Sequence, residues 1–240
     1  MAQQDIQTWL SSAYADQYLR AQGEHLNRAV RTAASPTTLV IGRIGDHAII
    51  DKLDLPFLCR VTIDSEQLAA GRVDVVASNA FLPFPEKSFA TVVLLHGLET
   101  SDLPHQTLRE AHRVLQADGH LVLAGFNPFS LLGLQRLVRT PALPKGQIYG
   151  LRRVLDWLNL LDFEVVGSSM FQYGPLSRHA RLRRYFAFLE SVGDRWFPLL
   201  GGAYMLVARK REIRSNLIGL KRRTLPQKAR QALPIKSSLK

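Results

Sequence analysis

The sequence lacks residues and patterns on which several classes of protein depend. Cys59 is its single cysteine, so the chain can form no internal disulfide and no cysteine-based zinc site. No apolar run approaches the ~18 residues of a membrane-spanning helix, and the first residues show no secretory signal. Neither a metal-ligand spacing of His, Asp and Glu nor a Gly-x-Ser-x-Gly motif is present. We therefore expect a cytoplasmic protein with no bound metal and no membrane partner.

Acidic residues are scarce relative to basic ones, and the imbalance is concentrated at the C-terminus. The 240 residues include 31 Lys and Arg against 20 Asp and Glu, a formal net charge of +11. From Arg209 onward there are eleven basic residues and one acid, Glu212, which leaves the first 208 residues close to neutral. Residues 209–240 either form a solvated tail that keeps the protein in solution or bind the phosphates of a nucleic acid.

Seven short apolar runs, each bounded by turn or polar residues, predict seven strands. The run at residues 92–95 is apolar without alternation, which is typical of a strand covered on both faces in a parallel sheet. The predicted strands are Thr38–Ile41, Cys59–Ile63, Val73–Ala77, Phe89–Leu95, Leu121–Ala124, Phe163–Val166 and Ala203–Ala208.

Apolar stripes at helical spacing predict three helices between or before these strands. One falls within the first thirty residues, one runs from caps at Ser101 and Asp102 to Gly119, and one follows Gly150. Alternating strands and helices indicate an α/β fold with a Rossmann-like, doubly wound, mostly parallel seven-stranded sheet, in which the last two strands add an antiparallel edge strand.

This organisation predicts three segments along the chain. We expect an N-terminal helical segment over residues 1–34 that packs on the core, a single domain over 35–210, and a flexible basic tail over 211–240.

Residues at the predicted carboxyl ends of the strands are the candidate ligand contacts, because ligands bind there in doubly wound sheets. Gly42 and Gly45 follow the first strand with the spacing Gly-x-x-Gly, not the Gly-x-Gly-x-x-Gly of a dinucleotide fold. They permit a close approach to a ligand, or simply make a tight turn. Asp64 ends the second strand, where a carboxylate can accept hydrogen bonds from ribose hydroxyls or cap a helix.

The segment from Asn79 to Asn127 carries the most specific motifs. It contains the turn Leu82-Pro83-Phe84-Pro85-Glu86-Lys87-Ser88-Phe89, a strand ending His96-Gly97-Leu98-Glu99, the helix Leu108-Arg109-Glu110-Ala111-His112-Arg113-Val114-Leu115, and Gly119-His120-Leu121. In these motifs the sequence resembles the type 11 branch of the class I S-adenosylmethionine-dependent methyltransferases, over roughly residues 35–210. Gly125–Leu131 resembles a small bacterial subgroup of that branch.

The resemblance implies one S-adenosylmethionine site. Gly42 and Gly45 would line the methionine end, and Asp64 would hold the ribose. Asn79 stands where the family usually has an Asp near the adenine amino group, and its carbonyl oxygen can accept that hydrogen bond. Ala80 would lie beside it.

Three further positions are candidates for action on the acceptor. The resemblance places His96 near the methionine portion and the transferable methyl, where it is also the best candidate for a general base. Asn127, at the end of the fifth strand, could orient a polar acceptor or simply form a turn. Tyr173 belongs to the aromatic residues around the Arg-rich stretch 178–186, which either binds a phosphorylated or nucleic-acid acceptor or is an amphipathic helix.

Three functions from different classes follow from this sequence. The first is a methyltransferase that acts on an unidentified acceptor, either a small molecule or RNA. The second is a non-catalytic Rossmann-like protein that binds nucleic acid through its tail, since Val40 replaces the usual acidic residue of the first strand and Ile44 a glycine. The third is a nucleotide-dependent oxidoreductase, which the missing Gly-x-Gly-x-x-Gly disfavours. The sequence leaves the oligomeric state open.

Overall fold

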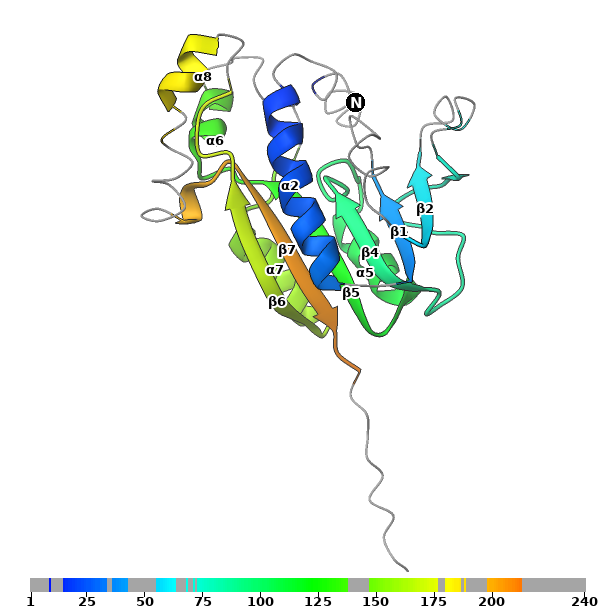
Figure 1. The fold of residues 1–240 in the computed structure, drawn as a ribbon. Coiled ribbons are helices and arrows are strands. Elements are labelled where there is room, and N and C mark those ends of the chain that lie inside the picture. Colours follow the sequence, from blue (N-terminus) through cyan, green and yellow to red (C-terminus); the bar gives the residue numbers. More distant parts are fainter. Residues whose placement is uncertain are drawn as a thin grey trace, which may run out of the picture.

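The fold is a single seven-stranded sheet with helices on both faces (Figure 1). The computed structural model describes residues 9, 15–33, 36–42, 55–63, 68, 71, 73–137, 147–176, 180–186, 188 and 198–212. The strands are β1 (Thr37–Ile41), β2 (Phe57–Thr62), β3 (Val75–Val76), β4 (Phe89–Leu95), β5 (Leu115–Phe126), β6 (Phe163–Phe171) and β7 (Ala203–Lys210). The helices are α2 (Ala15–Ala33), α5 (Pro104–Val114), α6 (Leu131–Leu137), α7 (Leu151–Leu160), α8 (Ala180–Phe186) and the short 3₁₀ helix η1 (Pro198–Leu200).

The strand order confirms the predicted doubly wound, mostly parallel sheet. It runs β3-β2-β1-β4-β5-β7-β6, and the four pairs formed among β1 to β5 are all parallel. Strand β7 is antiparallel to both β5 and β6, so the reversed strand lies one position in from the edge and β6 forms the edge itself. All seven predicted runs are strands, and the antiparallel pairing falls between the last two, as the sequence predicted.

Strand β4 explains why its apolar run does not alternate. Val93 and Leu95 point into the core beneath α2, while Val92 and Leu94 point into the core beneath α5 and α7. Each of these side chains is buried. A strand with helices on both faces has no solvent face, so polar residues have no place in it.

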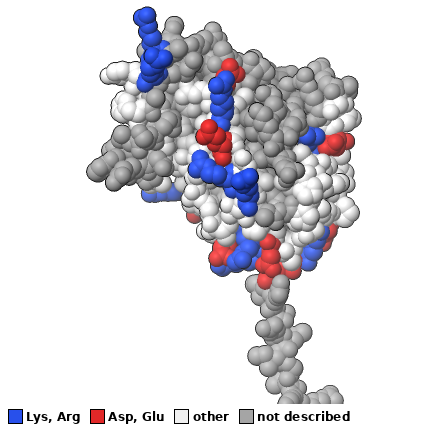
Figure 2. Space-filling view, viewed as in Figure 1, with Lys and Arg blue, Asp and Glu red and all other residues white. Residues whose placement is uncertain are grey.

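Helix α2 covers one face of the sheet, where it packs against β5, β6 and β7 (Figure 1). Its buried stripe is Tyr18, Leu19, Gln22, Leu26, Ala29 and Val30. Asp16, Arg20, Glu24 and Arg28 recur at every fourth residue, and charges of alternating sign line the outer face of this helix (Figure 2). Pairs of opposite charge at this spacing support an exposed helix face.

Helix α5 begins and ends differently from the prediction. Its N-cap is Leu103, which makes no side-chain capping bond, so Ser101 and Asp102 are not the caps. It ends at Val114 rather than near Gly119. Its end is held by Lys210, whose Nζ donates to the carbonyl oxygens of His112 at 2.8 Å and Leu115 at 2.9 Å. An ammonium group at a helix C-terminus satisfies carbonyls that have no partner within the helix.

The first residues of the basic C-terminal segment therefore belong to the fold. Arg209 and Arg211 both pair with Glu164, and Glu212 pairs with Lys87. Residues 213–240 lie outside the described residues, so the flexible tail remains a prediction. No helix within the described ranges has both the length and the apolar character to cross a membrane.

Candidate active site at the carboxyl edge of the sheet

Gly42, the first candidate residue, directly follows β1 and lies close to the end of β4. Its φ is +103°, a region that favours glycine. A Cβ atom at this position would collide with the carbonyl oxygen of Leu95. His96 follows Leu95 directly and has a φ of +52°, so β4 turns sharply where the two strand ends meet. The glycine is thus required by the close approach of two strands, at the edge where a ligand is expected.

A small pocket of about 140 Å³ lies at the same edge, beyond the ends of β2, β3 and β4. Ile63 lines it from β2, the segment 78–80 from β3, and the segment 100–103 from the turn after β4. Ligand pockets commonly measure ~300–1,000 Å³, so this one can receive only part of a nucleoside cofactor, such as its base.

Asn79 and Ala80 are both buried and line this pocket, and their contact with adenine stays a prediction. The Asn79 Nδ2 donates to Thr100 Oγ1 at 3.5 Å, and Thr100 Oγ1 donates to the His96 carbonyl oxygen at 2.9 Å. This arrangement commits the amide nitrogen of Asn79 to the protein. Its carbonyl oxygen is then the atom that would accept from an adenine amino group.

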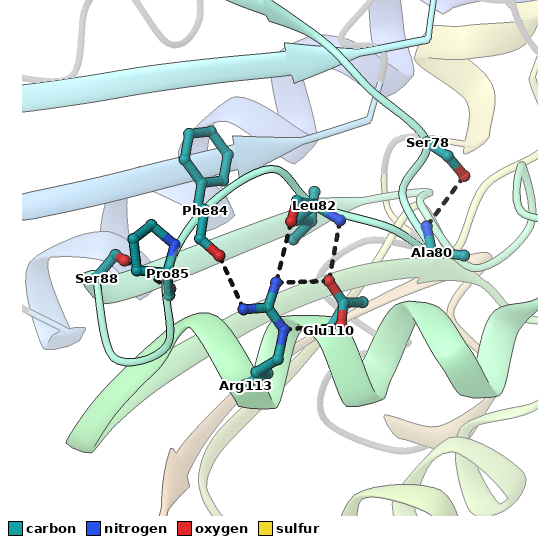
Figure 3. Close-up of polar contacts among 8 residues, drawn as sticks. All are labelled: Ser78, Ala80, Leu82, Phe84, Pro85, Ser88, Glu110 and Arg113. Atoms are coloured by element: carbon teal, nitrogen blue, oxygen red, sulfur yellow. Dashed lines mark hydrogen bonds and ion pairs between the residues drawn. The ribbon is translucent and has the colours of Figure 1, made fainter.

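Glu110 and Arg113 of α5 hold the turn at residues 82–84, which follows Asn79 and Ala80 in the chain (Figure 3). The Arg113 guanidinium donates to the carbonyl oxygens of Leu82 at 3.0 Å and Phe84 at 2.8 Å. It also pairs with the Glu110 carboxylate at 2.8 Å, and that carboxylate accepts the Leu82 N–H at 2.9 Å. Two motifs that lie about thirty residues apart in the sequence are therefore one structural unit.

Glu110 and Arg113 each stabilise the charged form of the other. The hydrogen bond from Arg113 lowers the pKa of the Glu110 carboxyl below its usual value, and the pKa of Arg113 is raised by the same bond. Both groups stay charged at neutral pH, and planar guanidinium is suited to bridging a carboxylate and two carbonyls. The sequence pointed to these residues only as a family motif; their role in holding the turn was missed.

His96 directly follows β4, but it is 1% exposed, and its ring already makes hydrogen bonds within the protein. Its Nε2 lies 2.8 Å from the Tyr18 hydroxyl and 3.1 Å from the Gln22 Nε2. The ring also stacks on Phe126 with centroids 4.3 Å apart. An amide N–H can only donate, so Nε2 accepts and the proton of the neutral ring resides on Nδ1. Tyr18 and Gln22 of α2 were not predicted to reach this residue.

Glu99 is the second ionisable residue at the end of β4, and it is 3% exposed. Its Oε1 accepts the Phe126 N–H at 2.9 Å and lies 3.6 Å from His96 Nδ1, too far for a hydrogen bond. Among the described residues, neither His96 Nδ1 nor Glu99 Oε2 has a hydrogen-bond partner. Buried polar atoms without partners are rare, so these two offer a donor and an acceptor to a polar group that enters the site.

Two buried tyrosines surround this carboxylate. Burial raises the pKa of Tyr204 well above its ordinary value, and the negative charge of Glu99 adds to the shift. The same two causes, in the same order, raise the pKa of Tyr18. Both phenols are therefore neutral hydrogen-bond donors at physiological pH, and Tyr204 donates to the Tyr149 carbonyl oxygen at 2.9 Å.

Asn127 follows β5 and has a fully engaged side chain. Its Nδ2 donates to the carbonyl oxygens of Leu199 and Gly201, each at 2.9 Å, and its Oδ1 accepts the Phe129 N–H at 3.1 Å. This is the turn-forming role that the sequence left open, and it ties β5 to the segment before β7. Its role toward an acceptor stays a prediction.

Tyr173 is buried and lies apart from the small pocket at β2 to β4. It lines a cavity of about 720 Å³ between α2 and β6, together with Gln17, Glu24 and Arg28. In the Arg-rich stretch, Arg181, Arg184 and Tyr185 of α8 are exposed. Gly45, Asp64 and residues 177–179 lie outside the described residues, so the predicted ribose contact cannot be placed and stays a prediction.

Comparisons with known proteins find one matching domain family and one relative. Residues 55–123 match the model of the type 11 methyltransferase domain. The uncharacterised protein YafS of Escherichia coli strain K12 is 39% identical over 166 residues, which are 67% of this chain and 65% of that protein. The match therefore spans slightly less than two thirds of the relative's own length.

Solved structures share the fold at low identity. A methyltransferase from Thermotoga maritima superposes with a TM-score of 0.60 at 16% identity, over 80% of this chain and 91% of the other. One from Archaeoglobus fulgidus gives 0.55 at 15% identity, over 81% and 97%. Both are described as S-adenosylmethionine-dependent.

The strand order and the site at the carboxyl edge define a class I methyltransferase fold, as the sequence motifs predicted. The match over residues 55–123 supports the resemblance of that segment to the type 11 branch of the S-adenosylmethionine-dependent methyltransferases.

Proposed function

We propose that this protein binds S-adenosylmethionine at the carboxyl edge of its sheet and transfers the methyl group to an acceptor. The observation that carries the proposal is the pocket bounded by Ile63, the segment 78–80 and the segment 100–103. In doubly wound sheets a nucleoside ligand lies beyond the ends of the central strands. The Glu110–Arg113 pair holds the turn at 82–84, which follows the segment 78–80 that lines the pocket.

Residues on three strand ends fit the cofactor. Gly42 would face the methionine end, where the backbone of β1 comes close to that of β4. Asn79 would accept from the adenine amino group, with Ala80 beside it. Asp64, the residue after Ile63, would hold the ribose hydroxyls. Val40, which replaces the usual acidic residue, is buried in the core beneath α2, so the methionine amino group needs a different partner.

When bound, the cofactor supplies a methyl group on a sulfonium, which is a good leaving group. The protein's contribution is then to align an acceptor with that methyl and to keep water out. His96 would take the acceptor's proton at Nε2, the ring nitrogen that has no proton of its own in the observed arrangement. Tyr18 and Gln22 of α2 cover this nitrogen. Either α2 must move away from His96 to admit the acceptor, or the Tyr18 hydroxyl must pass its own proton to His96 and take the acceptor's proton in exchange.

Titration with S-adenosylhomocysteine tests the assignment of the adenine end. Asn79→Ala removes the accepting oxygen and should weaken binding by about 1 kcal/mol, roughly fivefold. Asn159→Ala on the exposed side of α7 is the matched control and should bind as the wild type does. Equal affinities for the two variants would remove Asn79 from the site. Asp64→Ala should cost about 1–3 kcal/mol, since a charge-assisted bond is stronger.

A further inference from the structure

A group of large apolar side chains is exposed where β5 leaves the sheet. Phe129 is 76% exposed, Leu134 56% and Leu199 61%, and Leu131 and Leu200 are about half exposed. These five residues, from the turn after β5, from α6 and from η1, are called the apolar patch below. Exposed apolar clusters of this kind mark surfaces that bind a partner.

Two depressions connect the residues of the apolar patch. One, of about 620 Å³, lies between Phe129, Leu199 and the first turn of α7. The other, of about 510 Å³, is lined by Phe129, Leu131, Leu134 and Leu200. Because Phe129 and Leu200 line both, the patch is one continuous surface rather than scattered side chains.

Basic side chains lie beside the apolar patch. Arg152 and Arg153 line the larger depression, and Arg181 and Arg184 are exposed on α8. Helices α6, α8 and η1 lie at the same end of the molecule (Figure 1), and basic side chains stand out at that end (Figure 2). The acidic residue Asp156 is exposed further along α7, one turn after Arg152 and Arg153.

We propose that the apolar patch and its arginines dock on an anionic lipid surface. Leu and Phe side chains gain by entering the acyl boundary, while arginines at the rim are attracted to anionic headgroups. A nucleic acid fits less well, because the aliphatic side chains of Leu131, Leu134, Leu199 and Leu200 offer bases neither hydrogen bonds nor stacking. From the sequence we expected no membrane partner, because no spanning helix was found, but a docking surface requires no spanning helix.

Docking would bring the catalytic edge to the lipid surface. The larger depression begins at Asn127, where β5 ends, and the ends of β4 and β5 lie side by side in the sheet. This inference does not depend on methyl transfer, because lipid binding is measured without cofactor or acceptor.

Vesicle sedimentation of the full chain tests the proposal. Vesicles of phosphatidylcholine with phosphatidylglycerol should bind the protein, and those of phosphatidylcholine alone should bind it much less. The double variant Phe129→Ser, Leu134→Ser should lose at least about tenfold in affinity for the anionic vesicles. Leu160→Ser, at the far end of α7, is the matched control, since Leu160 is 80% exposed and lies outside the patch. Unchanged melting temperatures should accompany all these variants.

The basic C-terminal segment also attracts anionic lipid, and it is retained in every variant. Equal binding by the wild type and the double variant would therefore assign vesicle binding to that segment and overturn the proposal. Absence of vesicle binding would overturn it as well. If light scattering shows a dimer that the double variant dissociates, or if only a single-stranded RNA binds through Phe129 and Leu134, the patch serves another partner and the proposal is wrong.

Discussion

The Tyr18 hydroxyl lies 2.8 Å from Nε2 of His96, although 78 residues separate them in the chain. Tyr18 belongs to the N-terminal helix α2, and His96 ends the central strand β4. Both side chains are almost completely buried, and their rings lie 5.7 Å apart. The helix before the sheet therefore packs over the carboxyl end of β4 and holds the candidate base.

Removing the Tyr18 hydroxyl tests how much its hydrogen bond to His96 contributes to the stability of the protein. Tyr18→Phe should lower the free energy of unfolding by about 1 kcal/mol, because Gln22 remains as a partner for His96. Tyr185→Phe removes a hydroxyl from a side chain that is 72% exposed, and it should change stability by less than about 0.5 kcal/mol. Chemical denaturation of both variants measures the difference. Equal stabilities would contradict the contact.

Replacing Arg113 should reduce stability far more than replacing Arg109 on the same helix. Arg113→Ala removes two bonds to the turn at 82–84 and leaves the Glu110 carboxylate without its cation. The pair is only partly buried, so we expect a loss of about 2 kcal/mol, together with weaker cofactor binding. Arg109 is exposed, and Arg109→Ala should be neutral. Arg113→Lys should not restore stability or cofactor binding, because an ammonium group cannot bridge three acceptors in one plane.

The lowered pKa of Glu110 predicts a pH dependence of stability. A carboxyl with a lower pKa in the folded state stabilises the protein above its unfolded pKa of about 4.3 and loses that contribution as the pH falls through its folded pKa. The stability difference between the wild type and Glu110→Gln should therefore be constant from about pH 6 to 8 and shrink below about pH 4. A difference that grows on acidification would contradict the assignment. Denaturation series at each pH provide the measurement.

Gly42 and Gly71 form a matched pair of glycines with positive φ. A Cβ atom at Gly71 would meet nothing within 4 Å, so Gly71→Ala should cost only the backbone strain, about 1 kcal/mol. Gly42→Ala has the same type of strain and also a collision with the Leu95 carbonyl oxygen. It should cost about 3 kcal/mol or more and should weaken cofactor binding. Thermal melting and ligand titration of the two variants should separate them clearly.

The sequence predicted the sheet well because strands carry local signals. Each apolar run with turn residues on both sides proved to be a strand, and the continuous run at 92–95 correctly indicated a strand covered on both faces. Glu110 and Arg113 were visible as a motif. Their bonds to the turn at 82–84 were not, since a spacing in sequence does not specify which carbonyls a side chain reaches.

Contacts between segments that are distant in the chain could not be predicted from the sequence. Lys210 was counted with the basic tail, because a charge count treats every Lys as solvated, whereas it is 5% exposed and holds the end of α5. Tyr18 lies on an apolar stripe whose partner on the sheet could not be known. The exposure of Phe129 and Leu134 likewise depends on how α6 and η1 are placed, which no local pattern fixes.

Isothermal calorimetry of the full chain with S-adenosylmethionine, S-adenosylhomocysteine and NAD tests the central claim most directly. We predict that both sulfur ligands bind at one site per chain and that Arg113→Ala weakens this binding whereas Arg109→Ala does not. NAD should give no heat. If neither sulfur ligand gives heat of binding, the carboxyl edge of the sheet is not a cofactor site and the account is wrong.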